Sequence, residues 1–291
     1  MRFGRVGVAW IAGLVASALP SLLATASGTQ AGEAIVDGTS VAVLASLLAV
    51  AFRSSRFRPL AGYLAALLAI EVGVIATTVY GRSVWWEDWA RNVPTGTRFA
   101  AANATKVVPA AALALTLLGS GLHRRDVFLG LGDLRARLRL NARPTVARWW
   151  TLAVIALPVS LFPVLNNVVG NRDVSLPFDT ALAQAPIIIF GAAANTLLEE
   201  FLFRQVLLAR LLPVIGADTA LAITSIRFGI GHWSGNPAGP MGVLLATGFG
   251  LFQGKCMLDC RGSGWPWLVH FANDILIFTL IAMTPTGDWR P

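Results

Sequence analysis

Charged residues are scarce in this sequence. Asp, Glu, Lys and Arg together make up 13% of the 291 residues, whereas hydrophobic residues make up 55%. Soluble globular domains carry about 25% charged residues, so this composition excludes an ordinary soluble protein. The long apolar runs instead predict an integral membrane protein of the all-α class, a polytopic bundle of about eight to nine transmembrane helices.

Cysteine and histidine are rare as well. The two cysteines, Cys256 and Cys260, are too few and too close together for a disulfide framework. We interpret them as packed thiols one helical turn apart. The histidines are His123, His232 and His270, so any histidine chemistry has to use these three.

Positive charge is in excess, with a formal net charge of +8. The arginines lie in short segments between apolar runs, and segment 123–148 alone holds seven of them against Asp126 and Asp133. This distribution is typical of the cytoplasmic side of a membrane protein, and it favours contact with anionic lipid over nucleic acid. We therefore expect the lipid bilayer and no nucleic acid among the partners, and a location in the cytoplasmic (inner) membrane of a prokaryote.

The first 180 residues have the pattern of accessory spans. The expected helices cover residues 6–26, 34–52, 59–80, 106–122 and 149–169. Segment 6–26 has two interpretations. Ala24-Thr25-Ala26 is similar to a signal-peptide cleavage site, whereas an apolar length of about 20 residues favours a retained helix. Tryptophans beside acidic residues in segment 81–105 predict a short helix on the outer membrane surface.

From residue 181 onward, ionisable groups occur inside apolar segments, and we expect residues 181–291 to form the catalytic core. Glu199 and Glu200 follow an uncharged run that begins at residue 181. A charged side chain at membrane depth costs roughly 2.5 to 3.5 kcal/mol on insertion scales. Two adjacent carboxylates with Arg204 one turn later therefore indicate a reaction centre.

Helical spacing organises the polar residues of this core into pairs. The pairs separated by four residues are Glu200 with Arg204, Phe228 with His232, and His270 with Asp274. Residues four apart share one helix face, so three helices each offer one polar face. Glu199 is rotated by about 100° from Glu200 and is free to face a different neighbour.

A glutamate and two histidines can hydrolyse an acyl bond in two ways. In the first, Glu199 is the general base for water and His232 shares the proton. His270, oriented by Asp274, then stabilises an oxyanion. In the second, Glu199, His232 and His270 bind zinc, with water in the open position. The sequence lacks a dense zinc motif such as H-E-x-x-H, which weakens the second possibility.

The three motifs resemble, in order, those of the CPBP intramembrane protease family. They are Glu199-Glu200-x-x-x-Arg204, Phe228-x-x-x-His232 and His270-x-x-x-Asp274. That family includes the type II CAAX prenyl endopeptidases and proteins of bacteriocin processing and self-immunity. The glycines between the second and third motifs also fit, because they let neighbouring helices approach closely. The resemblance covers about residues 181–278.

The resemblance implies a role for each matching residue. Glu199 is the water-activating base together with His232, while His270 and Asp274 lie on the oxyanion side. The residues expected to shape the site are Glu200, Arg204, Phe228 and Asn273. The resemblance favours a metal-free mechanism without a cofactor, with the zinc set of Glu199, His232 and His270 as the alternative.

These observations predict an intramembrane endopeptidase that acts on a membrane-associated or membrane-anchored peptide or protein. The alternative is a non-catalytic membrane immunity factor or an ion-coupled carrier that retains the polar core. Alternating the spans from an inside N-terminus places His232 and Glu199 at different depths. We therefore expect either a break in the helix that bears Glu199 or a segment 215–232 that does not cross the membrane fully.

Overall fold

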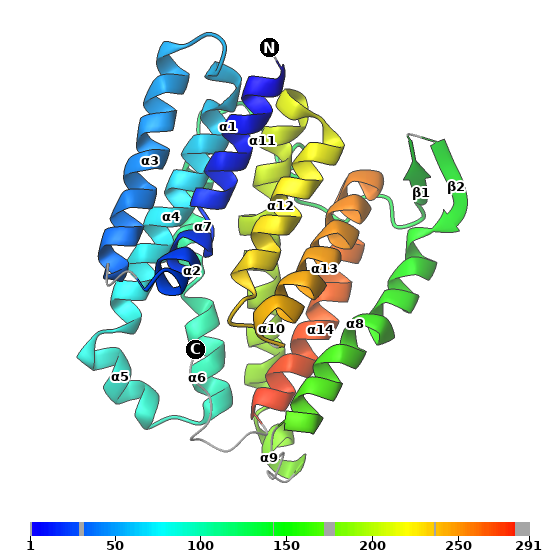
Figure 1. Cartoon of the computed structure of the whole chain (residues 1–291). Helices are drawn as coiled ribbons and strands as arrows, with labels where there is room; N and C mark the ends of the chain where they lie inside the picture. The colour runs from blue at the N-terminus through cyan, green and yellow to red at the C-terminus, as the bar shows by residue number, and fades with distance from the viewer. Residues whose placement is uncertain (1, 29–31, 142, 172–177, 236, 283–291) are drawn as a thin grey trace. The chain divides into compact units, whose positions relative to one another are not determined.

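The computed structural model describes residues 2–28, 32–141, 143–171, 178–235 and 237–282. These residues are helical throughout apart from loops and one two-stranded hairpin (Figure 1), which confirms the all-α class. The helices are α1 (Arg2–Val15), α2 (Leu19–Ala26), α3 (Glu33–Arg53), α4 (Ala61–Gly81), α5 (Val84–Arg91), α6 (Thr95–Ala104), α7 (Val107–Leu115), α8 (Trp149–Asn171), α9 (Phe178–Ala183), α10 (Ala185–Glu200), α11 (Val206–Ile215), α12 (Ala217–Gly231), α13 (Gly239–Cys260) and α14 (Gly264–Ala282). The short elements are the 3-10 turn η1 (Arg58–Leu60), the π-helical turn η2 (Phe201–Gln205), and the strands β1 (Arg137–Leu140) and β2 (Arg143–Arg148).

The chain divides into two compact units. The first comprises Met1–Ala76, Val108–Leu129 and Phe201–Lys255, and the second comprises Thr77–Val107, Gly130–Glu200 and Cys256–Pro291. Each unit thus contains segments from before and after residue 180. The predicted division into an accessory part and a catalytic part concerns function, and it stays a prediction.

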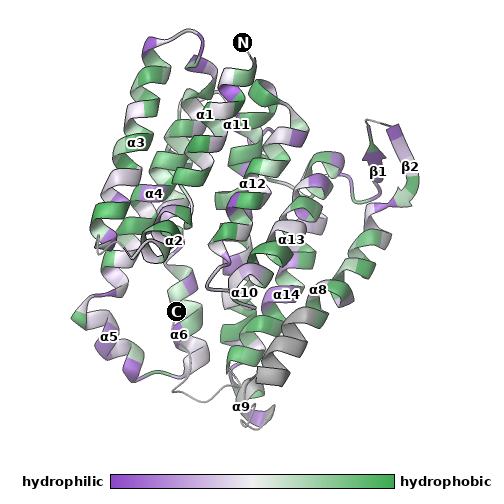
Figure 2. Cartoon of the chain, viewed as in Figure 1, coloured by the Kyte–Doolittle hydropathy of each residue, from purple (hydrophilic) through white to green (hydrophobic). Residues whose placement is uncertain are grey.

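Five helical segments of the described residues are long and apolar enough to cross a membrane, or six if a bent pair near the N-terminus forms one span. The five are Glu33–Arg53, Arg58–Gly81, Ala185–Ile215, Gly239–Cys260 and Gly264–Ala282. Figure 2 colours the ribbon by hydropathy, and hydrophobic residues (green) occur along these helices. The chain is therefore an integral, multi-pass membrane protein, and the spans predicted at 34–52 and 59–80 are confirmed.

The described part of the chain offers five or six candidate spans, and the total of eight to nine stays a prediction. Within the predicted span 106–122, α7 has only 9 residues. Gly119 and Gly121, which have φ values of 70° and 72°, lie in the turns that follow it. The 15 residues of α12 extend about 22 Å at the helical rise, less than the roughly 30 Å hydrocarbon core. This length agrees with one of the two expectations, a segment 215–232 that does not cross the membrane fully, and that expectation stays a prediction.

The first unit contains a broken helix where the sequence predicted a single span at 6–26. The axes of Phe3–Val15 and Leu19–Ala26 differ by 66°. The break is stabilised by Ser17, whose hydroxyl accepts a hydrogen bond from the backbone N–H of Leu19. Pro20, in the first turn of α2, cannot continue the hydrogen-bond ladder of α1 because it lacks an N–H group.

A buried arginine satisfies the carbonyl group at this break. Arg227 of α12 is 5% exposed, and its Nε donates a 2.7 Å hydrogen bond to the Ala16 carbonyl oxygen. Its guanidinium group also lies 4.8 Å from the centre of the Phe203 ring. Carbonyl groups at the end of a helix have no partner within the helix, so Arg227 supplies one from a distant part of the sequence.

Replacing Arg227 with Met should therefore destabilise the protein. The substitution leaves the buried Ala16 carbonyl without its donor, at a cost of about 1–3 kcal/mol. The measurement is the unfolding midpoint of the purified protein in detergent. Arg53→Met, which removes an exposed arginine, is the control and should leave the midpoint unchanged. Equal midpoints for wild type and the Arg227 variant would contradict the proposed contribution.

The second unit is built around α10, which packs against α6 and α14, while α8 packs against α14. Its core contains Ala100, Ile188, Ala192, Phe278 and Ala282. The rings of Phe99 and Phe278 meet edge to face at 4.4 Å. Helix α6 thus contributes Ala100 and Phe99 to the core of this unit. The short helix predicted from the tryptophans of segment 81–105 corresponds to α5 (Val84–Arg91), and its place on the outer membrane surface stays a prediction.

Candidate active site

Glu199 and Glu200 are the last two residues of α10, and both are buried, with 7% and 1% exposure. The π-helical turn η2 follows them directly. Such turns are frequent at functional sites, because one extra residue in the turn rotates the side chains that follow. The carboxylates therefore lie where a π-helical turn replaces the regular α-helix within the continuous helical span Ala185–Ile215. The break expected in the helix that bears Glu199 stays a prediction.

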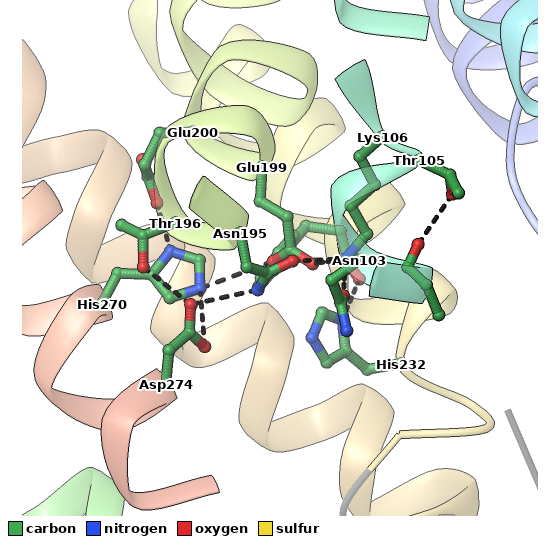
Figure 3. A network of polar contacts seen from close by, with 12 residues as sticks. Asn103, Thr105, Lys106, Asn195, Thr196, Glu199, Glu200, His232, His270 and Asp274 are labelled. Carbon is green, nitrogen blue, oxygen red and sulfur yellow. Dashed lines mark hydrogen bonds and ion pairs between the residues drawn. The ribbon is translucent and has the colours of Figure 1, made fainter. Parts of the chain in front are cut away.

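Lys106 is the direct cationic partner of Glu199. Its Nζ lies 2.5 Å from Glu199 Oε1 and donates 2.6 Å hydrogen bonds to Asn195 Oδ1 and Asn103 Oδ1 (Figure 3). An ammonium group has three donors and no acceptor, so three oxygens satisfy it completely. This arrangement balances one buried carboxylate and ties α6 to α10.

Sequence reasoning missed Lys106, which it treated only as the start of a span. One signal was present, since Lys106 and Lys255 are the two lysines of a chain with 23 basic residues. An isolated lysine beside an apolar run suggests a specific partner. The pattern did not show which carboxylate that partner would be.

His270 of α14 faces carboxylates with both ring nitrogens. Its Nδ1 lies 2.7 Å from Glu200 Oε1, while Nε2 lies 3.5 Å from Glu199 Oε2 and 3.7 Å from Asp274 Oδ1. Only the first distance is that of a hydrogen bond, and it joins His270 to Glu200. Glu200 thus holds the ring at Nδ1, and the expectation that Asp274 orients His270 stays a prediction. The predicted pairing of Glu200 with Arg204 stays a prediction.

Asp274 is held by α10. Its Oδ2 accepts hydrogen bonds from Asn195 Nδ2 at 3.0 Å and from Thr196 Oγ1 at 2.7 Å. The amide of Asn195 thus links Asp274 to Lys106. Asn273, predicted to shape the site, donates from Nδ2 to the Val269 carbonyl of its own helix at 2.8 Å.

The remaining predicted residues belong to the first unit, where they form a group of their own. The Arg204 guanidinium lies 4.1 Å from the centre of the Phe228 ring. The rings of Phe228 and His232 are 4.3 Å apart, and His232 Nδ1 lies 2.9 Å from the Phe228 carbonyl oxygen. The spacing of four residues therefore places Phe228 and His232 in contact, and Arg204 covers the same aromatic ring.

The alternative zinc set takes Glu199 and His270 from the second unit and His232 from the first, so it stays a prediction. Within the described ranges, no group of three or more His, Cys, Asp or Glu residues is arranged to hold a metal ion. Glu199 Oε1, an oxygen of the alternative zinc set, is already paired with the Lys106 ammonium group. We therefore derive no step through a metal.

The arrangement in the second unit suits general base chemistry. One oxygen of Glu199 is held by a cation, and the other faces an imidazole. A carboxylate in such a position can take a proton from a water molecule, and an adjacent imidazole can share or return that proton. The hydrogen bonds from Asn195 and Thr196 fix Asp274 through Oδ2. Its other oxygen, Oδ1, lies 3.7 Å from Nε2 of His270.

Comparison with known proteins gives one match. Residues 181–276 match the family described as Type II CAAX prenyl endopeptidase Rce1-like. This segment is about a third of the chain, and it contains Glu199, His232, His270 and Asp274. No curated protein and no solved structure matches the chain. The family match agrees with the resemblance recognised in the three sequence motifs.

Proposed function

We propose that residues 181–276, the segment that matches the type II CAAX prenyl endopeptidase family, carry the catalytic residues of an intramembrane endopeptidase. The observation that carries this proposal is the placement of Glu199, with Oε1 paired to Lys106 and Oε2 directed to His270. A buried carboxylate held in this way is suited to activate water. The reaction is hydrolysis of a peptide bond in a substrate held at the membrane.

In the proposed mechanism, Glu199 Oε2 takes a proton from water, and the water oxygen bonds to the carbonyl carbon of the peptide. The carbonyl oxygen becomes an oxyanion, which His270, held by Glu200 and placed next to Asp274, stabilises. Glu199 then returns the proton to the leaving nitrogen as the carbon–nitrogen bond breaks. We include His232 as a second proton carrier on the basis of its motif alone.

Lys106 is the positioning residue of this mechanism. Its ammonium group binds the oxygen of Glu199 that does not face His270. This contact fixes which carboxylate oxygen meets the water and compensates the buried negative charge. Asn103 and Asn195 hold the ammonium group in turn.

The proposed substrates are peptides or proteins anchored in or beside the bilayer. A CAAX substrate carries a prenylated cysteine near its C-terminus, and the family match makes this the first substrate class to assay. The proposed location is the cytoplasmic membrane of a prokaryote. A non-catalytic immunity factor or a carrier is the alternative outcome of the experiments below.

Metal removal should leave the proteolytic activity unchanged. The measurement combines metal analysis of the purified protein with an assay before and after treatment with a chelator. We expect less than one equivalent of bound metal and full activity, because the Lys106 ammonium group already binds Glu199 Oε1. Loss of activity on chelation and its recovery with zinc would overturn the metal-free mechanism and favour the set of Glu199, His232 and His270.

A further inference from the structure

The arginine-rich segment 123–148, expected as a loop, contains the hairpin of β1 and β2. The four arginines of the two strands are all exposed, and they are Arg137, Arg139, Arg143 and Arg148. Arg137 pairs directly with Arg148 across the strands, and like charges in such positions repel each other. In the part of the chain that the structure describes, no carboxylate forms an ion pair with these four side chains. Among the described residues, the hairpin therefore presents four guanidinium groups that are not paired with a carboxylate.

The hairpin is attached to the turn between two membrane spans. Residues leading into β1 bond to this turn, since the backbone N–H of Asp133 donates to the Cys260 carbonyl at 2.7 Å and that of Ser263 donates to the Gly130 carbonyl at 2.8 Å. Helix α13 ends at Cys260 and helix α14 begins at Gly264 (Figure 1). A turn that joins two spans lies at a membrane surface, so the hairpin is held at that surface.

Two further contacts fix the orientation of the hairpin. Asp259 Oδ2 accepts hydrogen bonds from the backbone N–H of Arg139 at 2.9 Å and from Trp149 Nε1 at 3.1 Å. Gly132 has a φ of 70°, and a Cβ atom there would collide with the Cys260 carbonyl. Only glycine fits this close approach without strain. The hairpin is thus attached to the turn before β1, within β1 and after β2.

Large apolar side chains are exposed beside the arginines. They are Leu131, Leu134, Leu140, Val146 and Trp150, with exposures of 70%, 40%, 57%, 93% and 45%. A basic segment that also exposes leucine, valine and tryptophan has the composition of elements that lie in the headgroup region of a bilayer. Nucleic acid would neutralise the arginines, but it would leave these side chains in water.

We propose that the hairpin binds the headgroups of anionic phospholipids in the adjacent leaflet. The four guanidinium groups bind lipid phosphates, for which their planar donor geometry is well suited. The exposed apolar side chains enter the boundary with the acyl chains. The bound lipid relieves the repulsion between Arg137 and Arg148, and it connects lipid composition to the stability of the second unit. This proposal does not depend on the proposed protease activity.

The test compares lipid retention and melting of the full-length protein. Wild type and a variant with Arg137, Arg139, Arg143 and Arg148 all replaced by Gln are reconstituted in nanodiscs of phosphatidylcholine alone or mixed with phosphatidylglycerol. The melting temperature of the wild type should be higher in the anionic nanodiscs, and the variant should lose this difference. Phosphatidylglycerol retained in detergent, measured by native mass spectrometry, should fall by on the order of tenfold or more.

A matched control carries the same change in charge. It replaces Arg53, Arg58, Arg124 and Arg125, which are exposed outside the hairpin, with Gln and should retain phosphatidylglycerol like wild type. A second variant with Lys at the four hairpin positions keeps the charge and should retain most of the binding. If the quadruple Gln variant does not fold, Arg139→Gln with Arg143→Gln replaces it. Unchanged retention in the hairpin variants, or equal loss in the control, would overturn the proposal.

Discussion

Glu199→Gln should abolish peptide bond hydrolysis while the protein remains folded and inserted. The amide cannot accept the proton of the attacking water, and general base catalysis contributes about 100- to 10,000-fold to rates. We therefore expect kcat to fall by at least about 100-fold. The measurement is cleavage of a membrane-anchored peptide by the purified, reconstituted protein. Glu87→Gln, an exposed position in the same unit, is the matched control and should cleave normally.

Loss of activity in Glu199→Gln indicates a catalytic role for Glu199 only if the variant is folded like the wild type. Gln can still accept the hydrogen bond from Lys106, so helical content and melting temperature should stay close to wild type. Normal cleavage by Glu199→Gln and by His232→Ala would remove the endopeptidase proposal. If neither the variants nor the wild type cleave any peptide, while the substitutions abolish protection or transport, the immunity factor or carrier is favoured.

Lys106→Met should also reduce kcat, by about 100-fold, with little change in KM. Methionine leaves Oε1 of Glu199 without its 2.5 Å partner, and a displacement of about 1 Å at a reacting group can cost 100-fold. Lys106→Arg keeps the charge in a different geometry and should recover part of the rate. Small alkylammonium ions should partly rescue Lys106→Ala, which a purely structural role would not predict.

Measuring kcat and KM separately for Lys106→Met distinguishes a positioning role of Lys106 from contact with the substrate. A raised KM with unchanged kcat would indicate contact with the substrate in place of a positioning role. An unchanged rate for Lys106→Met would contradict the positioning role, yet it would leave Glu199 as the base if Glu199→Gln is inactive. The two substitutions thus test the base and its positioning residue separately.

Several features of the molecule followed from local patterns in the sequence. The scarcity of charge determined that the chain is a membrane protein, and hydropathy located α3 and α4 nearly to the residue, because a span has to be long and apolar. The spacing of four residues placed Phe228 against His232, since residues four apart are neighbours on one helix face. The three polar motifs also located the segment that matches the CAAX endopeptidase family.

The lengths of the other helices depended on tertiary packing. A hydropathy pattern predicted a span at 106–122, but α7 ends at Leu115 and its polar neighbour Lys106 is held by α10. Likewise, α6 is buried because α10 and α14 cover it. Apolar composition shows that a segment avoids water, but it does not distinguish lipid from protein as the environment.

Only the tertiary structure determined which side chains contact each other in the candidate site. Lys106 and Glu199 are 93 residues apart in the sequence, and His270 and Glu200 are 70 apart. Helical periodicity relates residues within one helix, so it identified Glu199, His270 and Asp274 as separate candidates. Only the packing of α6, α10 and α14 determines that Lys106 binds one oxygen of Glu199 and that Glu200 holds His270, because contacts between helices leave no periodic pattern in the sequence.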